Sequence, residues 1–186
     1  MRNKRTLARL CESGRDLADW YNQANQGLQA GLGNRAGLAA DILAVTSPRV
    51  QLRRNVNITR HVLARWDSRD LTGLAPEGIL PNVVESLHRY RATGKITGKK
   101  TGPFARALRG DSSALVLDVW MARALGIPQS TLFNKSVYPA IVDRMTRTAQ
   151  RFQFTIAECQ AAIWSGTLRD NGRNPQYFPV HLLYQD

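Results

Sequence analysis

The feature that most constrains the fold of this chain is helical periodicity, which recurs in almost every segment of the sequence. Apolar residues return at intervals of three and four positions, the spacing that places them on one face of an α-helix. Strand-like alternation is scarce, and residues 180–184 are its nearest candidate. Turns that contain Gly or Pro separate the periodic segments. The pattern predicts an all-α fold.

The periodic segments also predict where each helix begins and ends. We expect a first helix over residues 5–29, followed by a glycine-containing connector at 27–37. Pro48 ends the second helix, because the residue before a proline disfavours helical backbone, and Pro81 suits a first helical turn. The tail from residue 169 is expected to be irregular. The helices expected after the connector cover residues 35–45, 50–65, 79–91, 100–108, 117–125, 137–152 and 155–164.

The length and composition agree with a globular protein. The chain has 186 residues, of which 43% are hydrophobic, enough to build a buried core in one compact domain. No run of about 18 apolar residues occurs, so we expect no membrane-spanning segment. The start, Met-Arg-Asn-Lys-Arg, is basic, but no apolar secretory core follows it. This predicts a cytoplasmic protein.

The metal-ligating residue types are few and scattered. The two cysteines, Cys11 and Cys159, are not in a CxxC spacing. Two thiols can build neither a four-cysteine zinc site nor an iron–sulfur cluster. His61, His88 and His181 show no metal-ligand spacing, and the acidic residues are dispersed. We therefore expect no metal and no cofactor, and two unpaired buried thiols rather than a disulfide.

The charge balance points to a polyanionic partner. Lys and Arg together number 26 and Asp and Glu 14, a net charge of +12. Such an excess on a small domain is the electrostatic footprint of nucleic-acid binding. A membrane surface also attracts cations, but no long basic amphipathic helix with an aromatic face is evident. We expect a monomer that binds double-stranded DNA, and the sequence leaves RNA open as an alternative.

Residues 85–125 carry the most informative motif. They read as a helix, a glycine-containing turn, a basic helix start, a second turn and an apolar run that ends in an aspartate. Gly94 and Gly98 permit a tight hairpin with positive φ. The backbone amides at the start of the following helix would face outward and favour a phosphate, which holds a nucleic-acid backbone without reading sequence. Three lysines lie beside this helix start, Lys95, Lys99 and Lys100.

These residues resemble the helix-hairpin-helix DNA glycosylase superfamily, which includes endonuclease III and 8-oxoguanine glycosylase. Gly98-Lys99-Lys100-Thr101 is similar to the Gly-x-Lys-Thr of that family at the start of the second hairpin helix. Val116-Leu117-Asp118-Val119-Trp120 is similar to the apolar stretch that carries its catalytic aspartate. Lys100 and Asp118 are 18 residues apart, a separation that matches the bifunctional members. The first hairpin glycine is displaced to Gly94.

A second similarity lies upstream, so that the resemblance spans residues 36–128. Leu43-Ala44-Val45-Thr46-Ser47, followed by Asn55, is similar to the family segment before the residue that fills the gap left by a flipped base. On this alignment Arg49 falls at the wedge position. Arg53 and Arg54 extend the basic surface beside it. The alternative interpretation of Arg49 is a surface arginine that contacts a phosphate.

The resemblance implies a helix-hairpin-helix DNA glycosylase-like fold with two helical lobes and a cleft between them. Lobe one would cover residues 36–130, and lobe two residues 1–35 and 131–186. The implied activity is excision of a flipped base, with Asp118 stabilising positive charge on the sugar. Lys100 would form a Schiff base at the sugar and give AP lyase activity. Trp120 and Trp164 would stack on the flipped base.

Three functional interpretations stay open at this point. The first is the DNA glycosylase with lyase activity. The second is a phage-type enzyme of the same fold that hypermodifies thymine, displacing a pyrophosphate with an amine. The third is a DNA-binding module without catalysis. The residues have structural alternatives too: Asp118 as a helix N-cap, Lys100 as a phosphate contact, and Trp120 and Trp164 as core residues. The protein would act at the nucleoid or in a phage-infected bacterial cell.

Overall fold

The computed structural model describes residues 6–68 and 73–184 of the chain. Every regular element in these ranges is a helix, which confirms the all-α prediction. The strand candidate at 180–184 is wrong: Val180–Leu183 forms a 3₁₀ helix, because the described residues offer no neighbouring strand and its N–H groups bond to nearby carbonyls instead. None of the described helices combines the length and the apolar character that a membrane crossing needs.

The chain divides into two compact units. Unit 1 contains Met1–Asn22 and Gly110–Tyr177, and unit 2 contains Gln23–Arg109 and Phe178–Asp186. The boundary after Arg109 falls inside the range 36–130 that the resemblance assigns to one lobe. Residues after this boundary belong to unit 1 because Leu115 and Leu117 are buried in the core of that unit.

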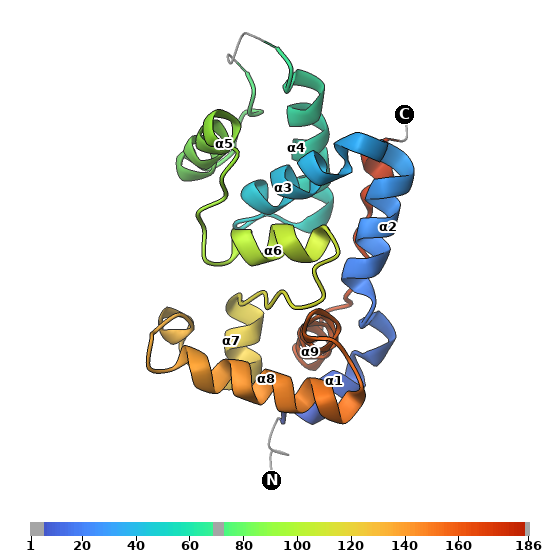
Figure 1. Cartoon of the computed structure of the whole chain (residues 1–186), viewed down its shortest axis with the longest axis vertical. Coiled ribbons are helices and arrows are strands. Elements are labelled where there is room, and N and C mark those ends of the chain that lie inside the picture. The colour runs from blue at the N-terminus through green and yellow to red at the C-terminus, as the bar shows by residue number, and fades with distance from the viewer. Residues whose placement is uncertain (1–5, 69–72, 185–186) are drawn as a thin grey trace. The chain divides into compact units, whose positions relative to one another are not determined.

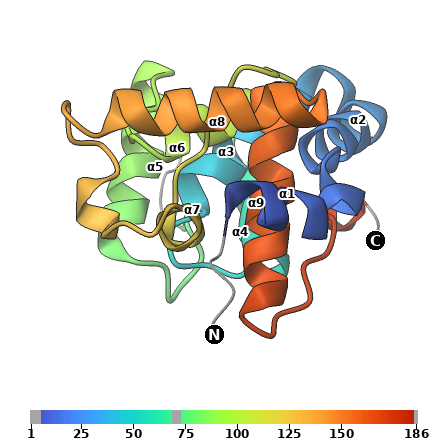
Figure 2. The same ribbon diagram turned by 90° about the horizontal axis from the view of Figure 1, so that it is seen from below.

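Unit 1 is built around its last helix, α9 (Ile156–Asp170). Figure 2 shows α8 (Tyr138–Phe152) lying across α9, and α1 (Leu7–Ser13) packs along α9. Residues from all four helices meet in the buried core, among them Leu10, Cys11, Met121, Met145 and Ile163. Cys11 and Cys159 are both free and buried. The helices of this unit are α1 (Leu7–Ser13), α7 (Val119–Leu125), α8 (Tyr138–Phe152) and α9 (Ile156–Asp170).

The single helix predicted over residues 5–29 is wrong. Helix α1 ends at Ser13, a 3₁₀ turn covers Arg15–Leu17, and α2 then runs over Trp20–Leu32. A Cβ atom at Gly14 would lie 2.1 Å from the carbonyl oxygen of Ala162. Glycine is required there because the backbones of α1 and α9 approach closely, and the chain breaks its helix at this crossing.

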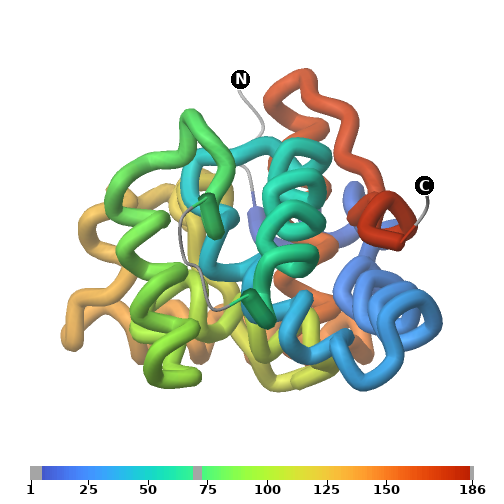
Figure 3. Tube along the Cα trace, turned by 90° about the horizontal axis from the view of Figure 1, so that it is seen from above, coloured from blue at the N-terminus to red at the C-terminus, as the bar shows by residue number. Residues whose placement is uncertain are grey.

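The glycine-containing connector predicted at 27–37 is also largely helical. Two of its glycines lie inside α2, where a Cβ on Gly27 would lie 2.4 Å from Val180 and one on Gly31 would lie 2.1 Å from the ring of Tyr184. Figure 3 shows the segment of Val180, in red, beside α2, in blue. These glycines make room for the C-terminal segment of unit 2, and they do not form a turn.

Helix α3 forms the centre of the rest of unit 2 (Figure 1). It is buried on all sides, including Ala39, Ile42 and Leu43, and packs against the other three helices of this part. A helix that is apolar all round belongs inside a protein. The four helices lie within a turn of their predicted bounds: α3 (Ala36–Thr46), α4 (Leu52–Arg65), α5 (Pro81–Thr93) and α6 (Thr101–Leu108).

Candidate functional site

In unit 2, a hairpin joins α5 to α6. Gly94 ends α5 in the left-handed conformation with φ 65°, and its N–H donates to the carbonyl of Tyr90 at 2.7 Å. The positive φ predicted for Gly94 is confirmed. The same prediction for Gly98 is wrong, because Gly98 does not have a positive φ. Glycine is needed there for a different reason: a Cβ would lie 2.1 Å from Oγ1 of Thr101.

The hairpin loop presents hydrogen-bond donors that find no acceptor among the described residues. The backbone N–H groups of Ile96, Thr97 and Gly98 donate to no described residue, and neither does the Lys95 ammonium. Lys95, Thr97 and Gly98 are exposed. Backbone amides and an ammonium in this arrangement are suited to a phosphate oxygen.

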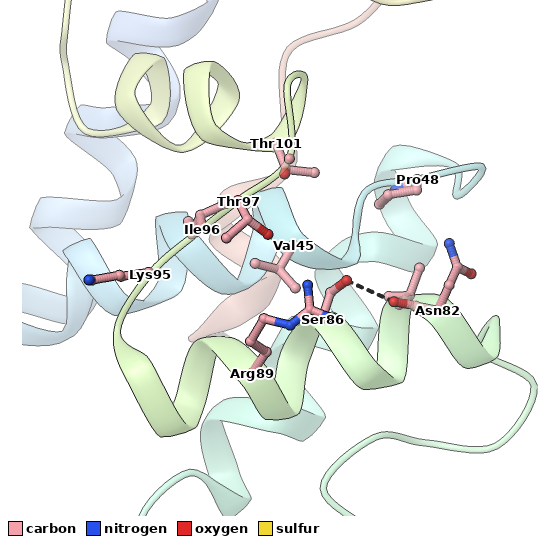
Figure 4. A pocket seen from close by; sticks show the side chains of 11 residues that line it. Val45, Pro48, Asn82, Ser86, Arg89, Lys95, Ile96, Thr97 and Thr101 are labelled. Carbon is pink, nitrogen blue, oxygen red and sulfur yellow. Dashed lines mark hydrogen bonds between the residues drawn. The ribbon is translucent and has the colours of Figure 1, made fainter.

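A small pocket with a volume of about 190 Å³ lies between this loop, α5 and the end of α3 (Figure 4). Val45 and Pro48 line it from the end of α3 and the turn that follows, and Ser86 and Arg89 line it from α5. Figure 4 shows the Lys95 side chain extending outward along the loop, away from the other lining residues. The pocket therefore joins the hairpin loop to the turn that carries the wedge candidate.

Arg49 lies in this turn with an unusual backbone. The N–H of Val50 bonds to the carbonyl of Ser47 at 3.3 Å, with Pro48 second and Arg49 third in the turn. Arg49 is exposed and has φ 60°, a conformation that favours glycine at this position of a turn. The turn is anchored by buried Asn55, whose amide donates to the Leu43 carbonyl at 2.8 Å.

The other candidates in unit 2 extend from the same elements. Arg53 and Arg54 are exposed in the first turn of α4, and Arg54 donates to the carbonyl of Gly78 at 3.0 Å. Lys99 precedes α6, and Lys100 occupies its N-cap position. Lys100 is half-buried, and its ammonium makes no ion pair or hydrogen bond with a described residue of unit 2. Among the described residues of unit 2, therefore, no carboxylate holds this amine.

In unit 1, Asp118 is the N-cap of α7. Its Oδ1 accepts hydrogen bonds from the backbone N–H groups of Trp120 at 2.9 Å and Met121 at 3.0 Å. This confirms the capping role given as the structural alternative. The second oxygen, Oδ2, accepts no hydrogen bond from a described residue of unit 1, and no described cation of that unit forms an ion pair with the carboxylate. Capping thus orients Asp118 and leaves one oxygen available.

Tyr21, whose pKa is affected by the Asp118 carboxylate, was not identified as a site residue from the sequence. The Tyr21 hydroxyl donates to Oε1 of Gln160 at 2.7 Å, and both side chains are buried. Burial raises the pKa of Tyr21 well above its usual value, and the negative charge of Asp118 raises it further. The phenol stays protonated near the carboxylate. Gln160 was a visible signal, as a polar residue on an apolar helix, but nothing in the sequence connected it to Tyr21.

The two tryptophans predicted to form the base pocket lie in different surroundings within unit 1. Trp164 packs against the core, with its ring centroid 6.0 Å from that of Trp20. This contact favours the core alternative for Trp164. Trp120 is half-buried, and the guanidinium carbons of Arg123 and Arg173 lie 4.3 and 4.9 Å from its ring centroid. The two tryptophans make no ring contact with each other.

The proposed reacting groups come from both units. Lys100 belongs to unit 2 with the hairpin, and Asp118 belongs to unit 1 with Tyr21 and Gln160. Among the described residues, no three His, Cys, Asp or Glu side chains are grouped so that they could hold a metal ion.

Comparison with known proteins places these residues in one family. No curated protein and no solved structure matches this chain. The model of a family of unknown function, DUF7178, matches residues 12–171, a range that contains the hairpin, Arg49, Lys100 and Asp118. The match covers most of the sequence, and the chain therefore belongs to the DUF7178 family.

Proposed function

We propose that this protein is a DNA-binding base-excision enzyme with a two-lobed helix-hairpin-helix DNA glycosylase-like fold. It would cleave the N-glycosidic bond of a flipped damaged or modified base and then cut the strand as an AP lyase. The observation that carries the proposal is the state of Asp118. Its carboxylate is oriented by two backbone N–H groups, its Oδ2 accepts no hydrogen bond from a described residue of its unit, and no described cation of that unit forms an ion pair with it.

This arrangement of Asp118 suits cleavage of an N-glycosidic bond. As the bond between the base and the sugar breaks, positive charge develops on the sugar ring. A carboxylate whose charge is not already paired stabilises that charge most effectively, because it needs no rearrangement at the moment of reaction. The free Oδ2 of Asp118 would face the sugar in this role.

Lys100 would supply the nucleophile. Its amine attacks C1′ of the sugar, and the base leaves with the glycosidic electron pair and takes up a proton. The nitrogen then loses a proton, its lone pair breaks the C1′–O4′ bond, and O4′ takes up a proton, which opens the sugar to a protonated Schiff base. Removal of a C2′ proton then expels the 3′ phosphate by β-elimination, and water hydrolyses the Schiff base to regenerate the amine. A half-buried lysine that forms no ion pair with a described carboxylate of its unit is suited to this step, because no such ion pair has to be broken.

The hairpin and the Arg49 turn would hold the DNA. The unused N–H groups of the loop, with Lys95, Lys99 and Thr101 beside them, are suited to the backbone phosphates of one strand. A non-glycine residue in the left-handed region costs about 1–2 kcal/mol, and such strain at an exposed position is typical of functional sites. Arg49 would enter the duplex where the base leaves it, with Arg53 and Arg54 at the neighbouring phosphates.

Borohydride trapping tests the proposal. The protein is incubated with a duplex that carries one abasic site, and sodium borohydride reduces any Schiff base to a stable adduct. We expect the wild-type protein and Lys135→Met to form the adduct and Lys100→Met to form none. Lys135→Met is the matched control because it removes an exposed amine that lies outside the hairpin. An unmodified protein that binds the duplex but forms no adduct would contradict the lyase assignment.

A further inference from the structure

A cluster of one tryptophan and two arginines in unit 1 is not explained by the proposed chemistry. Arg123 lies in the last turn of α7, three residues after Trp120, and Arg173 follows α9, just after Gly172 with φ 71°. Both arginines are exposed, and both guanidinium groups lie over the Trp120 ring. Two positive charges are therefore gathered on one aromatic ring from separate parts of the chain.

The neighbouring arginines of unit 1 show why this cluster differs. Arg15 also lies over aromatic rings, 5.3 Å from Phe152 and 5.7 Å from Phe154, but its charge is offset by Glu12 at 3.0 Å. Arg123 and Arg173 form no ion pair with a described residue of unit 1. Three further arginines of the unit have a carboxylate partner: Arg9 with Asp170, Arg147 with Asp143, and Arg169 with Asp16. Arg144 donates to the Leu125 carbonyl instead, and Arg151 lies over a single ring, 6.0 Å from Phe152.

Structural roles account for this cluster only in part. A cation in the last turn of a helix is stabilised by the helix dipole, which explains Arg123. The same effect does not apply to Arg173, which lies beyond the end of α9. Two guanidinium groups on one ring repel each other, and a bound anion would offset that repulsion.

The geometry selects the kind of anion. A guanidinium that stacks on an indole keeps the N–H donors at its edge available for hydrogen bonding. Planar forks of this kind match the oxygens of a phosphate, which they bind through two parallel hydrogen bonds. A carboxylate has the same shape, but the chain carries a net charge of +12, which favours a polyanion such as a nucleic acid over an acidic peptide.

We propose that Trp120, Arg123 and Arg173 form a phosphodiester-binding site on unit 1, in addition to the hairpin on unit 2. The site contacts the DNA backbone and gives the unit that carries Asp118 its own contact with the strand. Trp120 then serves as the platform that holds the two guanidinium groups, and not as a wall of the base pocket. The inference rests on the proposed DNA partner, but it does not depend on the catalytic roles of Lys100 and Asp118.

The dependence of duplex binding on salt tests this site. Each phosphate contact contributes about 0.9 to the slope of log K against log salt concentration. We expect the slope to decrease by about this amount in Arg173→Gln and in Arg123→Gln, with weaker binding at low salt. Arg15→Gln is the matched control, because it removes a guanidinium that stacks on aromatic rings but is already neutralised, and its slope should equal that of the wild type. Thermal unfolding checks that each variant is folded.

A second arm separates a phosphate in DNA from free phosphate. Inorganic phosphate is titrated into wild type and Arg173→Gln, and tryptophan fluorescence is recorded. Slopes that are unchanged in both glutamine variants overturn the inference, even if free phosphate alters the fluorescence. A reduced slope supports it, even if the borohydride experiment finds no adduct, so the failure of this site and the failure of the catalytic proposal are distinguishable.

Discussion

Two aspartates, one in each unit, show how differently a carboxylate can be held. Asp41 of unit 2 is 4% exposed, and its Oδ2 accepts a hydrogen bond from Tyr90 at 2.5 Å and forms an ion pair with Arg109. Asp118 of unit 1 is half-buried and is held by two backbone N–H groups, and no described cation of its unit forms an ion pair with it. The comparison teaches that a paired, buried carboxylate serves the fold, whereas a capped and unpaired one keeps its charge available.

Asp41 and Asp118 also differ in the number of helices that each carboxylate connects. Asp41 lies on α3, Tyr90 on α5 and Arg109 at the end of α6, so one carboxylate ties together the helices that carry the hairpin. Asp118 orients only its own helix. Substitutions that separate stability from activity should therefore act in opposite ways at the two positions.

The largest effect is expected from Asp118→Asn. Asparagine caps helices as well as aspartate does, so the free energy of unfolding should change by less than about 0.5 kcal/mol. Loss of the negative charge should slow base release by about 10²–10³-fold, the usual cost of removing one preorganised electrostatic group. The rate is measured under single-turnover conditions on a duplex that still carries the base to be excised. Asp118→Ala should lose the same activity and, in addition, about 1 kcal/mol in the free energy of unfolding. A normal rate in Asp118→Asn would remove the catalytic role.

The reverse outcome is expected from Asp41→Asn. Loss of the charge leaves the Arg109 guanidinium without its partner, and because that side chain is half exposed, we expect a loss of about 2 kcal/mol in the free energy of unfolding. Urea unfolding measures the change. The rate of base release per folded molecule should stay close to that of the wild type. A variant as stable as the wild type would show that Asp41 does not fasten these helices.

A smaller, pH-dependent effect is expected from Tyr90→Phe. Burial, together with the hydrogen bond to the Asp41 carboxylate, raises the pKa of Tyr90 above its usual value. The folded state therefore holds this proton more tightly than the unfolded chain, so the contribution of Tyr90 to stability is full below about pH 10 and is lost as the pH rises further. We expect Tyr90→Phe to lower the free energy of unfolding by about 1 kcal/mol at pH 7. Above about pH 10, the free energy of unfolding of this variant should fall less steeply with pH than that of the wild type. Equal slopes of stability against pH would contradict this account.

The smallest effect is expected from Arg49→Gly, which extends the comparison from carboxylates to the backbone. Relief of the left-handed conformation should raise the free energy of unfolding by about 1–2 kcal/mol. The greater freedom of glycine in the unfolded chain should lower it by about 0.5–1 kcal/mol. We expect a net gain of about 0.5–1 kcal/mol in stability, with weaker binding to a duplex that carries an abasic site. Arg53→Gly, on helical backbone, is the control and should lose stability. If Arg49→Gly binds such a duplex as well as the wild type, the wedge role is excluded.

Local signals in the sequence were sufficient for much of unit 2. Pro48 and Pro81 marked helix boundaries correctly, and the positive φ of Gly94 was predicted. These features depend on a few neighbouring residues, since proline and glycine act through their own backbone. In unit 1, the N-cap role of Asp118 could also be predicted, because a cap depends only on the side chain and the first backbone N–H groups of its own helix.

Contacts between distant segments were not visible in the sequence. Gly14 breaks the first helix because Ala162 approaches it, and Gly31 stays helical because Tyr184 packs there. The sequence pattern predicted a continuous helix through Gly14 and a connector around Gly31. In each case the observed conformation depends on a contact with a residue more than a hundred positions away in the chain. The placement of Arg173 over Trp120 has the same origin.

The helical class, the positive charge and the positions of most helix ends follow directly from the amino-acid sequence, because periodicity, composition and backbone restriction are local properties. Which charges are neutralised depends instead on the packing of distant segments. Asp41 and Asp118 cannot be told apart by their residue type, but one meets a guanidinium that arrives from 68 residues away and the other meets only the amides of its own helix. A carboxylate is available for chemistry when the fold brings no cation to it, and that depends on packing.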